Sequence, residues 1–165
     1  MEQQRSKTEI QIQAEIWKTI WKEFPETRRL LFHVPNESTY DDSQQASSGV
    51  IPGVPDLLFA WRGFTWYIEL KDDTGRISDA QKVFHANLDR QGIKTWLFFN
   101  SLDCIVFLRN VIPGADQSYM VKLMPEHISP YSDGSKYDFY LSEWQRKKQE
   151  ARARKAAKTS WPKKY

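Results

Sequence analysis

Three charged side chains adjoin strongly apolar stretches in the middle of the chain: Asp56, Glu69 and Lys71. Removing charged groups from water is costly unless they are paired or bound to a metal ion. Carboxylate oxygens are the hard ligands that Mg²⁺ and Mn²⁺ prefer, and such ions keep several waters, one of which can act as a nucleophile. These residue types therefore predict a divalent-metal site for hydrolysis, in which Lys71 positions a water or offsets charge on a phosphate. The alternative is an ordinary ion pair across two strands at the surface.

The elements that must bring these residues together are two apolar, aromatic runs, residues 57–61 and 64–70, which an Arg-Gly pair separates. This pattern is typical of a β-hairpin closed by a two-residue turn. In that register Asp56 lies opposite Glu69. Because side chains alternate along a strand, Lys71 lies on the same face as Glu69. The opposite face carries the residues directed to the core, which are Leu57, Phe59, Trp66 and Ile68.

Four short motifs follow one another: residues 53–56 read Gly-Val-Pro-Asp, residues 69–71 Glu-Leu-Lys, residues 75–78 Gly-Arg-Ile-Ser and residues 78–81 Ser-Asp-Ala-Gln. Their order and spacing resemble the VRR-NUC (virus-type replication-repair nuclease) family of the PD-(D/E)xK superfamily, in its stand-alone phage or bacterial form. The resemblance extends over about residues 8–110. It implies an α/β fold with a restriction-endonuclease-like core, a mixed central sheet flanked by helices, and Mg²⁺ or Mn²⁺ as the cofactor.

The same resemblance implies roles for individual residues. The two carboxylates of the hairpin hold the metal ion together with the main-chain carbonyl of Leu70, and Lys71 orients or deprotonates the attacking water. Gln81 lies in the first turns of the next helix, where it can reach the metal site or a phosphate; the alternative is an exposed helical glutamine. Ser78 is the expected N-cap of that helix and a candidate for supporting the site or contacting substrate.

Residues 6–9 have the Ser-x-x-Glu pattern of a capping box, which opens a helix that ends near Phe24. On a helical wheel Glu9 and Gln13 fall within the apolar stripe, whereas Glu15 is turned away. The resembled family carries a glutamate on its first helix, followed four residues later by Gln or Glu, and Glu9 with Gln13 fits that spacing. Glu9 is therefore a candidate catalytic residue and metal ligand, with Glu15 in reserve. The capping box is by itself a sufficient reason for Glu9.

A short apolar strand is expected over residues 30–34, and His33 lies near its end. Asn36 follows the strand and belongs to a polar loop that continues to Gly53. Both are candidates for contacting substrate or supporting the site. The chain has three histidines, and none is spaced i, i+4 from another, so a zinc-protease motif finds no support. The loop lacks the Lys-Ser/Thr pair of a phosphate-binding loop, so we expect no nucleotide cofactor.

After the hairpin, we expect a helix that begins after Ser78 and then a strand over residues 94–100, which the helix connects to the same sheet. Three further elements are expected in the rest of the chain: a helix over residues 101–111 capped by Ser101, a strand over residues 119–123 and a terminal helix over residues 140–158. The order of helix, strand, hairpin, helix and strand predicts an α/β sandwich. We expect residues 1–112 to form the nuclease core and residues 113–165 to be a C-terminal extension of the same globular unit.

Positive charge is concentrated at the C-terminal end. The whole chain has a net charge of +3, but residues 143–165 contain nine Lys or Arg and two Glu, a net of +7, which leaves −4 for the rest. A basic tail on an acidic body suggests that the tail binds phosphates; the alternative is a solvated helix that aids solubility. The candidate nucleic-acid contacts of this tail are Arg146, Lys147, Arg152 and Lys155, with Trp161 available for stacking.

A single cysteine, Cys104, rules out an internal disulfide framework and a cysteine zinc cluster, and we expect it to be a small buried hydrophobe. No apolar run approaches the length of a membrane span, and no secretory signal is recognisable. These features predict a protein of the cytoplasm with no membrane partner, and the resemblance to a phage or bacterial form of the family implies a bacterium or a phage-infected cell.

The leading hypothesis is a metal-dependent endonuclease that hydrolyses DNA phosphodiesters, acting on branched DNA such as four-way (Holliday) junctions in replication, recombination or repair. Branched substrates are implied by the resemblance, and a junction cut by one site per chain calls for a homodimer. Flap or single-strand cleavage and a restriction-type enzyme are alternatives within the same chemistry. The alternative of a different class is a protein that binds nucleic acid without cleaving it.

Overall fold

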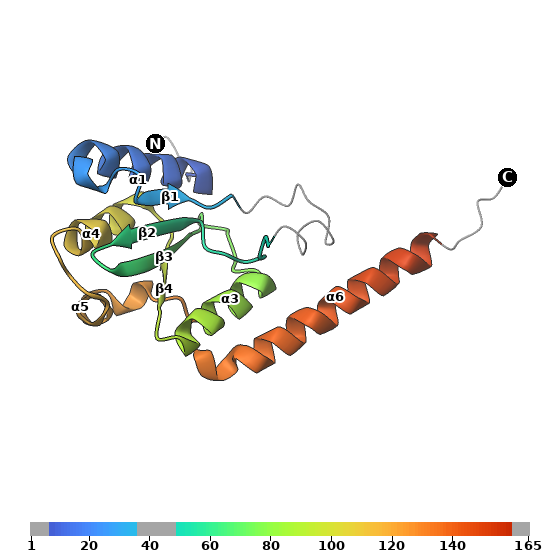
Figure 1. The fold of residues 1–165 in the computed structure, drawn as a ribbon. Coiled ribbons are helices and arrows are strands. Elements are labelled where there is room, and N and C mark those ends of the chain that lie inside the picture. Colours follow the sequence, from blue (N-terminus) through green and yellow to red (C-terminus); the bar gives the residue numbers. More distant parts are fainter. Residues whose placement is uncertain (1–6, 36–48, 160–165) are drawn as a thin grey trace, which may run out of the picture.

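The computed structural model describes residues 7–35 and 49–159, and a four-stranded sheet lies at the centre of these residues (Figure 1). The strands, in their order across the sheet, are β1 (Leu31–His33), β2 (Leu57–Trp61), β3 (Phe64–Leu70) and β4 (Thr95–Phe98). The first three pair antiparallel, whereas β4 pairs parallel to β3. The predicted mixed central sheet is therefore confirmed.

The β2–β3 hairpin turns at Arg62 and Gly63, whose φ angles are 49° and 83°. Two successive residues with positive φ are what a two-residue type I′ turn requires, and this turn matches the twist of the flanking strands. The register pairs Trp61 with Phe64, Phe59 with Trp66 and Leu57 with Ile68. This is the register expected from the sequence, and it carries Asp56 to the end of β3.

The helices of the described residues are α1 (Glu9–Glu23), α3 (Asp79–Arg90), α4 (Ser101–Val111), α5 (Gln117–Leu123) and α6 (Tyr137–Thr159), with 3-10 turns η1 (Pro25–Thr27), η2 (Pro125–His127) and η3 (Gly134–Lys136). Helix α3 connects β3 to the parallel strand β4, as the crossover prediction required. It covers the sheet face opposite the main core, where the Phe84 and Tyr67 rings lie 6.2 Å apart.

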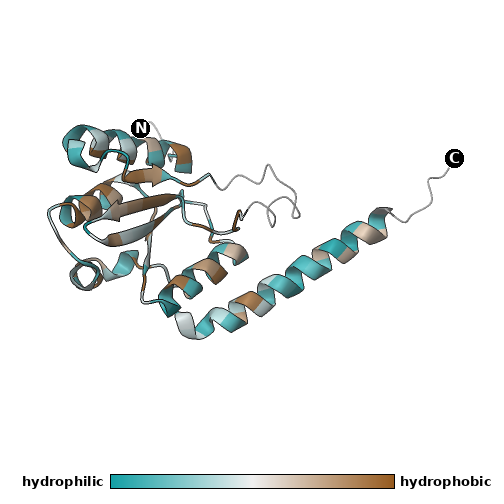
Figure 2. Cartoon of the chain, viewed as in Figure 1, coloured by the Kyte–Doolittle hydropathy of each residue, from teal (hydrophilic) through white to brown (hydrophobic). Residues whose placement is uncertain are grey.

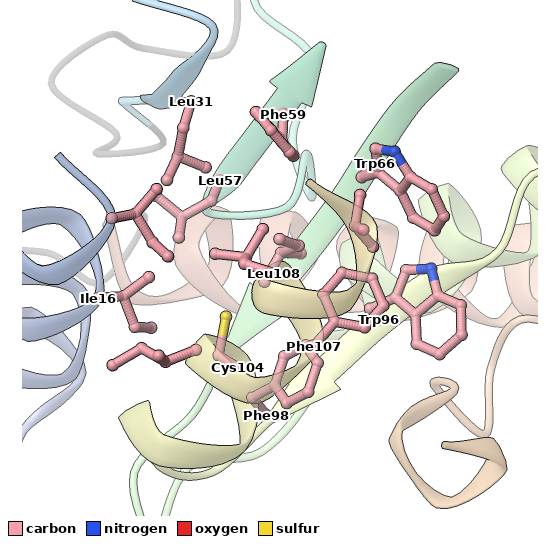
Figure 3. Packing of buried hydrophobic residues seen from close by; sticks show 14 of the residues in the cluster. Ile16, Leu31, Leu57, Phe59, Trp66, Trp96, Phe98, Cys104, Phe107 and Leu108 are labelled. Atoms are coloured by element: carbon pink, nitrogen blue, oxygen red, sulfur yellow. The ribbon is translucent and has the colours of Figure 1, made fainter. Parts of the chain in front are cut away.

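The main core lies between the sheet and the helices α1 and α4 (Figure 3). Its members include Ile16 of α1, Leu57 and Phe59 of β2, and Phe107 of α4, all essentially inaccessible to solvent. Cys104 is buried in the same cluster, as expected, and burial raises the pKa of its thiol far above the usual range. Burial of each large apolar side chain contributes on the order of 1.5–3 kcal/mol, so this layer holds α1 and α4 against the hairpin.

Three local predictions are wrong. The N-cap of α1 is Thr8, whose side chain accepts from the Gln11 N–H while the Gln11 side chain accepts from the Thr8 N–H. The capping box therefore begins two residues later than expected, Glu9 takes no part in it, and Ser6 lies outside the described residues. Helix α4 is capped by Asn100, not by Ser101.

The segment expected as a strand over residues 119–123 belongs to α5. Asp116 caps this helix by accepting from the Tyr119 N–H over 2.8 Å. Met120 is buried in the core, so tertiary packing and a strong cap outweigh the β preference of Tyr119 and Val121.

Helix α6 runs alongside α3 at its beginning and then extends away from the sheet, with a largely hydrophilic surface (Figure 2). None of the helices in the described part of the chain combines the length and the apolar character that a bilayer crossing demands.

Candidate active site

Main-chain contacts hold Asp56 at the open end of the hairpin. The Leu70 N–H donates to Asp56 Oδ2 over 2.8 Å. The Val34 N–H donates to the Asp56 carbonyl over 2.9 Å. These bonds tie the residue before β2 to the end of β3 on one side and to the end of β1 on the other, so the position of the carboxylate is fixed by the sheet.

Glu69 and Lys71 form a buried, closely spaced pair beside Asp56. Lys71 Nζ lies 2.6 Å from Glu69 Oε1, and the Gln81 amide Nε2 donates to the same oxygen over 2.5 Å. Glu9 Oε1 of α1 lies 3.5 Å from Lys71 Nζ. The structure therefore brings together at one point all five residues that the sequence suggested as catalytic.

Ser78 determines which way the Gln81 amide points. Ser78 is the N-cap of α3, and its Oγ accepts from the Gln81 N–H over 3.2 Å. The Ser78 N–H in turn donates to Gln81 Oε1 over 2.8 Å. Because the amide oxygen is occupied by this reciprocal capping box, the amide nitrogen is left facing Glu69. The hydroxyl of Ser78 thus supports the site through Gln81.

The buried cluster contains more negative than positive charge. Burial, followed by the charge of Asp56, raises the pKa of Glu69 to about 8, although Lys71 opposes this shift. Burial by itself would lower the pKa of Lys71, but the charges of Glu69, Asp56 and Glu9 hold it above its usual value. Glu69 therefore retains a proton at neutral pH chiefly because it is buried, and Lys71 retains its proton because carboxylates surround it. A cation bound beside the carboxylates would relieve this excess, and Lys71 is in its ammonium form, which donates hydrogen bonds.

His85 of α3 contributes to this site, and the sequence analysis did not identify it. The side chain is buried, its Nδ1 lies 2.8 Å from Ser129 Oγ, and its Nε2 lies 3.9 Å from Glu69 Oε2. Burial, followed by the charge of Lys71, lowers the pKa of His85 to about 3, so the imidazole is neutral. The signal that could have found it is its spacing: His85 follows Gln81 by one helical turn and so lies on the same face of α3.

The arrangement of sheet and helices around this cluster is known from another protein. No protein-family model matches the chain, and no curated protein does. A solved structure described as a "VRR_NUC domain protein" matches with a TM-score of 0.51 and 20% sequence identity, over 68% of this chain and 93% of that chain. The chain has the fold of a VRR_NUC domain protein. The fold that the sequence resemblance implied, an α/β core with a mixed central sheet flanked by helices, is therefore confirmed.

Within this VRR_NUC fold, Glu9 and Glu15 of α1 contact different parts of the molecule. Glu9 is partly exposed and adjoins Lys71. Glu15 accepts from Ser101 Oγ over 2.6 Å and pairs with Lys7, so it joins α1 to the start of α4 away from the candidate site. These two hydrogen bonds, Lys7 first, lower the pKa of Glu15. The helical-wheel prediction that Glu9, and not Glu15, points to the cluster is confirmed.

His33 lies at the edge of the site. Its Nδ1 lies 3.0 Å from the Asp56 carbonyl oxygen. A carbonyl only accepts, so Nδ1 carries the proton of this hydrogen bond and Nε2 is left as an acceptor in the neutral ring. Gln13 does not reach the cluster but lines a neighbouring pocket together with His33. Asn36, the other candidate from this segment, lies outside the described residues.

The donor set at the centre of the VRR_NUC fold fits a hard divalent cation. Asp56, Glu69 and Glu9 offer carboxylate oxygens, and Mg²⁺ is usually bound by one or two carboxylates while it keeps several waters. Glu69 Oε2 is buried and has no hydrogen-bond partner in the described part of the chain. Within residues 7–35 and 49–159 no group of three or more His, Cys, Asp or Glu side chains lies so that it could hold a metal ion. A Mg²⁺ or Mn²⁺ ion bound here would therefore rely on one or two of these carboxylates and complete its coordination with water.

The candidate tail residues lie on α6. Lys147 Nζ lies 2.8 Å from Asp79 Oδ2 in the first turn of α3. Arg146 pairs with Glu143 and Glu150 of its own helix, at 2.9 and 2.6 Å. Arg152 and Lys155 are exposed further along α6. Lys147 thus joins the tail to the helix that carries Gln81, whereas the later residues face solvent.

Proposed function

We propose that this protein is a divalent-metal-dependent nuclease that hydrolyses DNA phosphodiester bonds. The observation that supports this most strongly is the convergence of the partly buried Asp56 and Gln81 on the buried Glu69 and Lys71, which leaves more carboxylates than cationic groups at one point. A structural pairing of Lys71 needs one carboxylate, and a further carboxylate close to a buried one is costly without a cation. The fold shared with a VRR_NUC domain protein is consistent with this proposal.

The reaction joins a water oxygen to phosphorus and breaks the bond from phosphorus to the leaving oxygen of the chain. A bound Mg²⁺ or Mn²⁺ supplies Lewis-acid stabilisation of the phosphate charge and lowers the pKa of water. Asp56, fixed by the Leu70 N–H, and Glu69, fixed by Gln81, would hold the ion, and the Leu70 carbonyl and Glu9 would be further ligands. The Lys71 ammonium orients the attacking water and stabilises negative charge on the phosphate oxygens.

The decisive test compares wild type with Glu69→Ala and Lys71→Ala on end-labelled DNA in Mg²⁺, Mn²⁺ or EDTA. We expect cleavage with either metal, none in EDTA, and losses of at least about a hundredfold in both variants. Cleavage in EDTA, or full activity of both variants, would contradict the proposal. The rival reading is a protein that binds nucleic acid without cleaving it, and absence of Mn²⁺ binding in calorimetry at millimolar ion would favour it.

For the substrate, we propose branched DNA, with four-way junctions cut by a twofold homodimer. One chain presents one Asp56, Glu69 and Lys71 cluster, and paired cuts across a junction need two clusters related by symmetry. Matched duplex, flap, single-stranded and four-way substrates should be compared while light scattering reports the mass in solution. A monomer that prefers flaps or single strands, or cuts duplex at one sequence, would overturn this substrate and leave the metal-site proposal standing.

A further inference from the structure

A pocket of about 320 Å³ opens beside the candidate active site. It is lined by Ile10, Gln13, Ala14, Trp17 and Lys18 of α1 and by His33 of β1. Three of these six side chains are apolar, and two of the three are open to solvent, since Ile10 is 77% and Trp17 39% exposed. Apolar groups gathered in an open pocket indicate a ligand with an apolar face.

Two residues that line the pocket adjoin residues of the candidate active site. His33 lines the pocket and donates from Nδ1 to the Asp56 carbonyl over 3.0 Å. Ile10 lines the pocket and follows Glu9, whose carboxylate lies 3.5 Å from Lys71 Nζ. A nucleic-acid strand whose phosphate lies at the active site therefore has its adjoining nucleotide within reach of this pocket.

One wall of the pocket is Trp17, whose ring stacks on a second tryptophan. The Trp17 and Trp21 rings are stacked with centroids 4.5 Å apart and an interplanar angle of 26°. The Arg28 guanidinium lies 5.0 Å from the Trp21 centroid, and Arg28 Nε donates to the Trp21 carbonyl over 3.1 Å. Trp17 lines the pocket and Trp21 does not, so the stack ends in the pocket at Trp17. A planar ring would extend this stack.

We propose that this pocket binds one unpaired base of the nucleotide next to the scissile phosphate. The base stacks on Trp17, the Gln13 amide and His33 Nε2 offer hydrogen bonds to its polar edge, and Lys18 attracts the neighbouring phosphate. A base inside a duplex is covered by its neighbours and its partner, so it cannot occupy the pocket. The substrate class is therefore DNA in which one nucleotide at the cut is unpaired, as where a base is displaced at the branch point of a junction. This inference rests on the proposed nuclease function, because it places the base next to a phosphate that is cut. The binding of the base can nevertheless be measured without cleavage.

The experiment measures binding of short fluorescein-labelled oligonucleotides in EDTA by anisotropy, using wild type, Trp17→Ala, Trp17→Phe and Trp17→Leu. Phe139→Ala is the matched control, because Phe139 is an exposed aromatic residue on α6, outside the pocket. We expect Trp17→Ala and Trp17→Leu to raise the Kd for single strands and gapped DNA about tenfold, with little change for intact duplex. Trp17→Phe should retain most of the affinity, and Phe139→Ala should match wild type.

A set of strands with an abasic nucleotide at successive positions supplies the second measurement. In wild type one abasic position should weaken binding as much as Trp17→Ala does, and in Trp17→Ala the same position should cause no further weakening. The inference would be overturned if the abasic nucleotide and Trp17→Ala weakened binding additively. It would also be overturned if Trp17→Ala weakened binding to duplex and to single strands equally. A change from dimer to monomer in light scattering of Trp17→Ala would also overturn it, because a second copy would then occupy the pocket. Absence of cleavage with intact base binding would reject only the nuclease function.

Discussion

At the scale of single residues, the Glu69 carboxyl group is both a hydrogen-bond acceptor in the cluster and a candidate metal ligand. Its Oε1 accepts from both Lys71 and Gln81, while its Oε2 has no hydrogen-bond partner among the described residues and faces His85 Nε2 at 3.9 Å. The carboxylate is buried, and this burial raises its pKa to about 8. A metal ion requires the deprotonated form, so the proton and the ion compete for the same group.

We therefore predict that metal affinity rises with pH up to about 8. Below the pKa of Glu69 the carboxyl holds its proton, so each unit of falling pH should weaken binding by up to about tenfold. Between pH 6 and pH 8 the apparent Kd for Mn²⁺ should fall on the order of fifty-fold, as measured by calorimetry. Glu69→Gln should bind weakly with little dependence on pH. An affinity of wild type that is independent of pH would show that Glu69 is not a ligand.

The two glutamates of α1 form a matched pair for a second prediction. Glu9→Ala should weaken Mn²⁺ binding about tenfold, because it removes a carboxylate near Lys71, and should change stability by less than about 0.5 kcal/mol. Glu15→Ala should leave metal binding unchanged and cost about 1 kcal/mol, because Ser101 Oγ then has no acceptor in Glu15. Calorimetry and urea unfolding measure the two effects. The opposite pattern would identify Glu15 as the ligand and Glu9 as the structural residue.

At the scale of elements, the site depends on how closely the segment before β2 approaches α3. Gly53 has φ of 87°, and a Cβ at this position would lie 2.4 Å from the carbonyl carbon and oxygen of Ala80 and 2.7 Å from the Gln81 nitrogen. These are backbone atoms of the helix turn that carries Gln81. The absence of a side chain at Gly53 therefore sets the distance between the Asp56 segment and the Gln81 amide.

Gly53→Ala is expected to displace the first turn of α3 and to separate Gln81 from Glu69. The strain of positive φ costs about 1–2 kcal/mol, and the collision with backbone adds to it, so we expect a total destabilisation above about 3 kcal/mol and reduced cleavage. Gly92→Ala is the control, since φ there is 77° but nothing lies within 4 Å of an added Cβ. Gly92→Ala should lower the free energy of unfolding only by the backbone strain, and the variant should retain activity. Equal unfolding free energies in urea for the two variants would contradict this account.

At the scale of the whole molecule, helix α6 has one part that packs on α3 and another part that carries exposed basic residues. The beginning of the helix is anchored to α3 by the ion pair of Lys147 with Asp79 and by the Arg90 guanidinium 4.6 Å from the Tyr137 ring. Beyond this anchor the helix extends away from the sheet and exposes further basic residues: Arg152, Arg154, Lys155 and Lys158 (Figure 1). The extended half of α6 is therefore placed to meet DNA phosphates at some distance from the active site.

Replacing these four residues with Gln should weaken DNA binding and reduce its dependence on salt. Removing one ionic interaction with a phosphate lowers the slope of log K against log salt concentration by about 0.9 on duplex DNA, so removing four corresponds to about 3.6. Fluorescence anisotropy across a series of salt concentrations measures the slope. Lys147 stays in place, so the junction of α6 with α3 is preserved in this variant. An unchanged slope would mean that α6 has another task.

The features of this protein that depend on neighbouring residues were predictable from the order of the amino acids. Alternation in the runs on either side of Arg62 and Gly63 specifies the hairpin register, because a shift by one residue would expose the whole core face. Ser78 specifies the start of α3 in the same local way. These two local features suffice to place Asp56, Glu69 and Lys71 at one end of the sheet and Gln81 near them.

Features that depend on residues far apart in the chain could be recognised only in the folded protein. Glu15 is occupied by Ser101, which is 86 residues away, and His85 is held by Ser129, which is 44 residues away. The Trp17 ring, stacked on Trp21, borders a pocket that His33 of β1, 16 residues further along the chain, also lines. No local pattern records such contacts, since they arise when the core brings α1, α4 and the segment after α5 around the sheet.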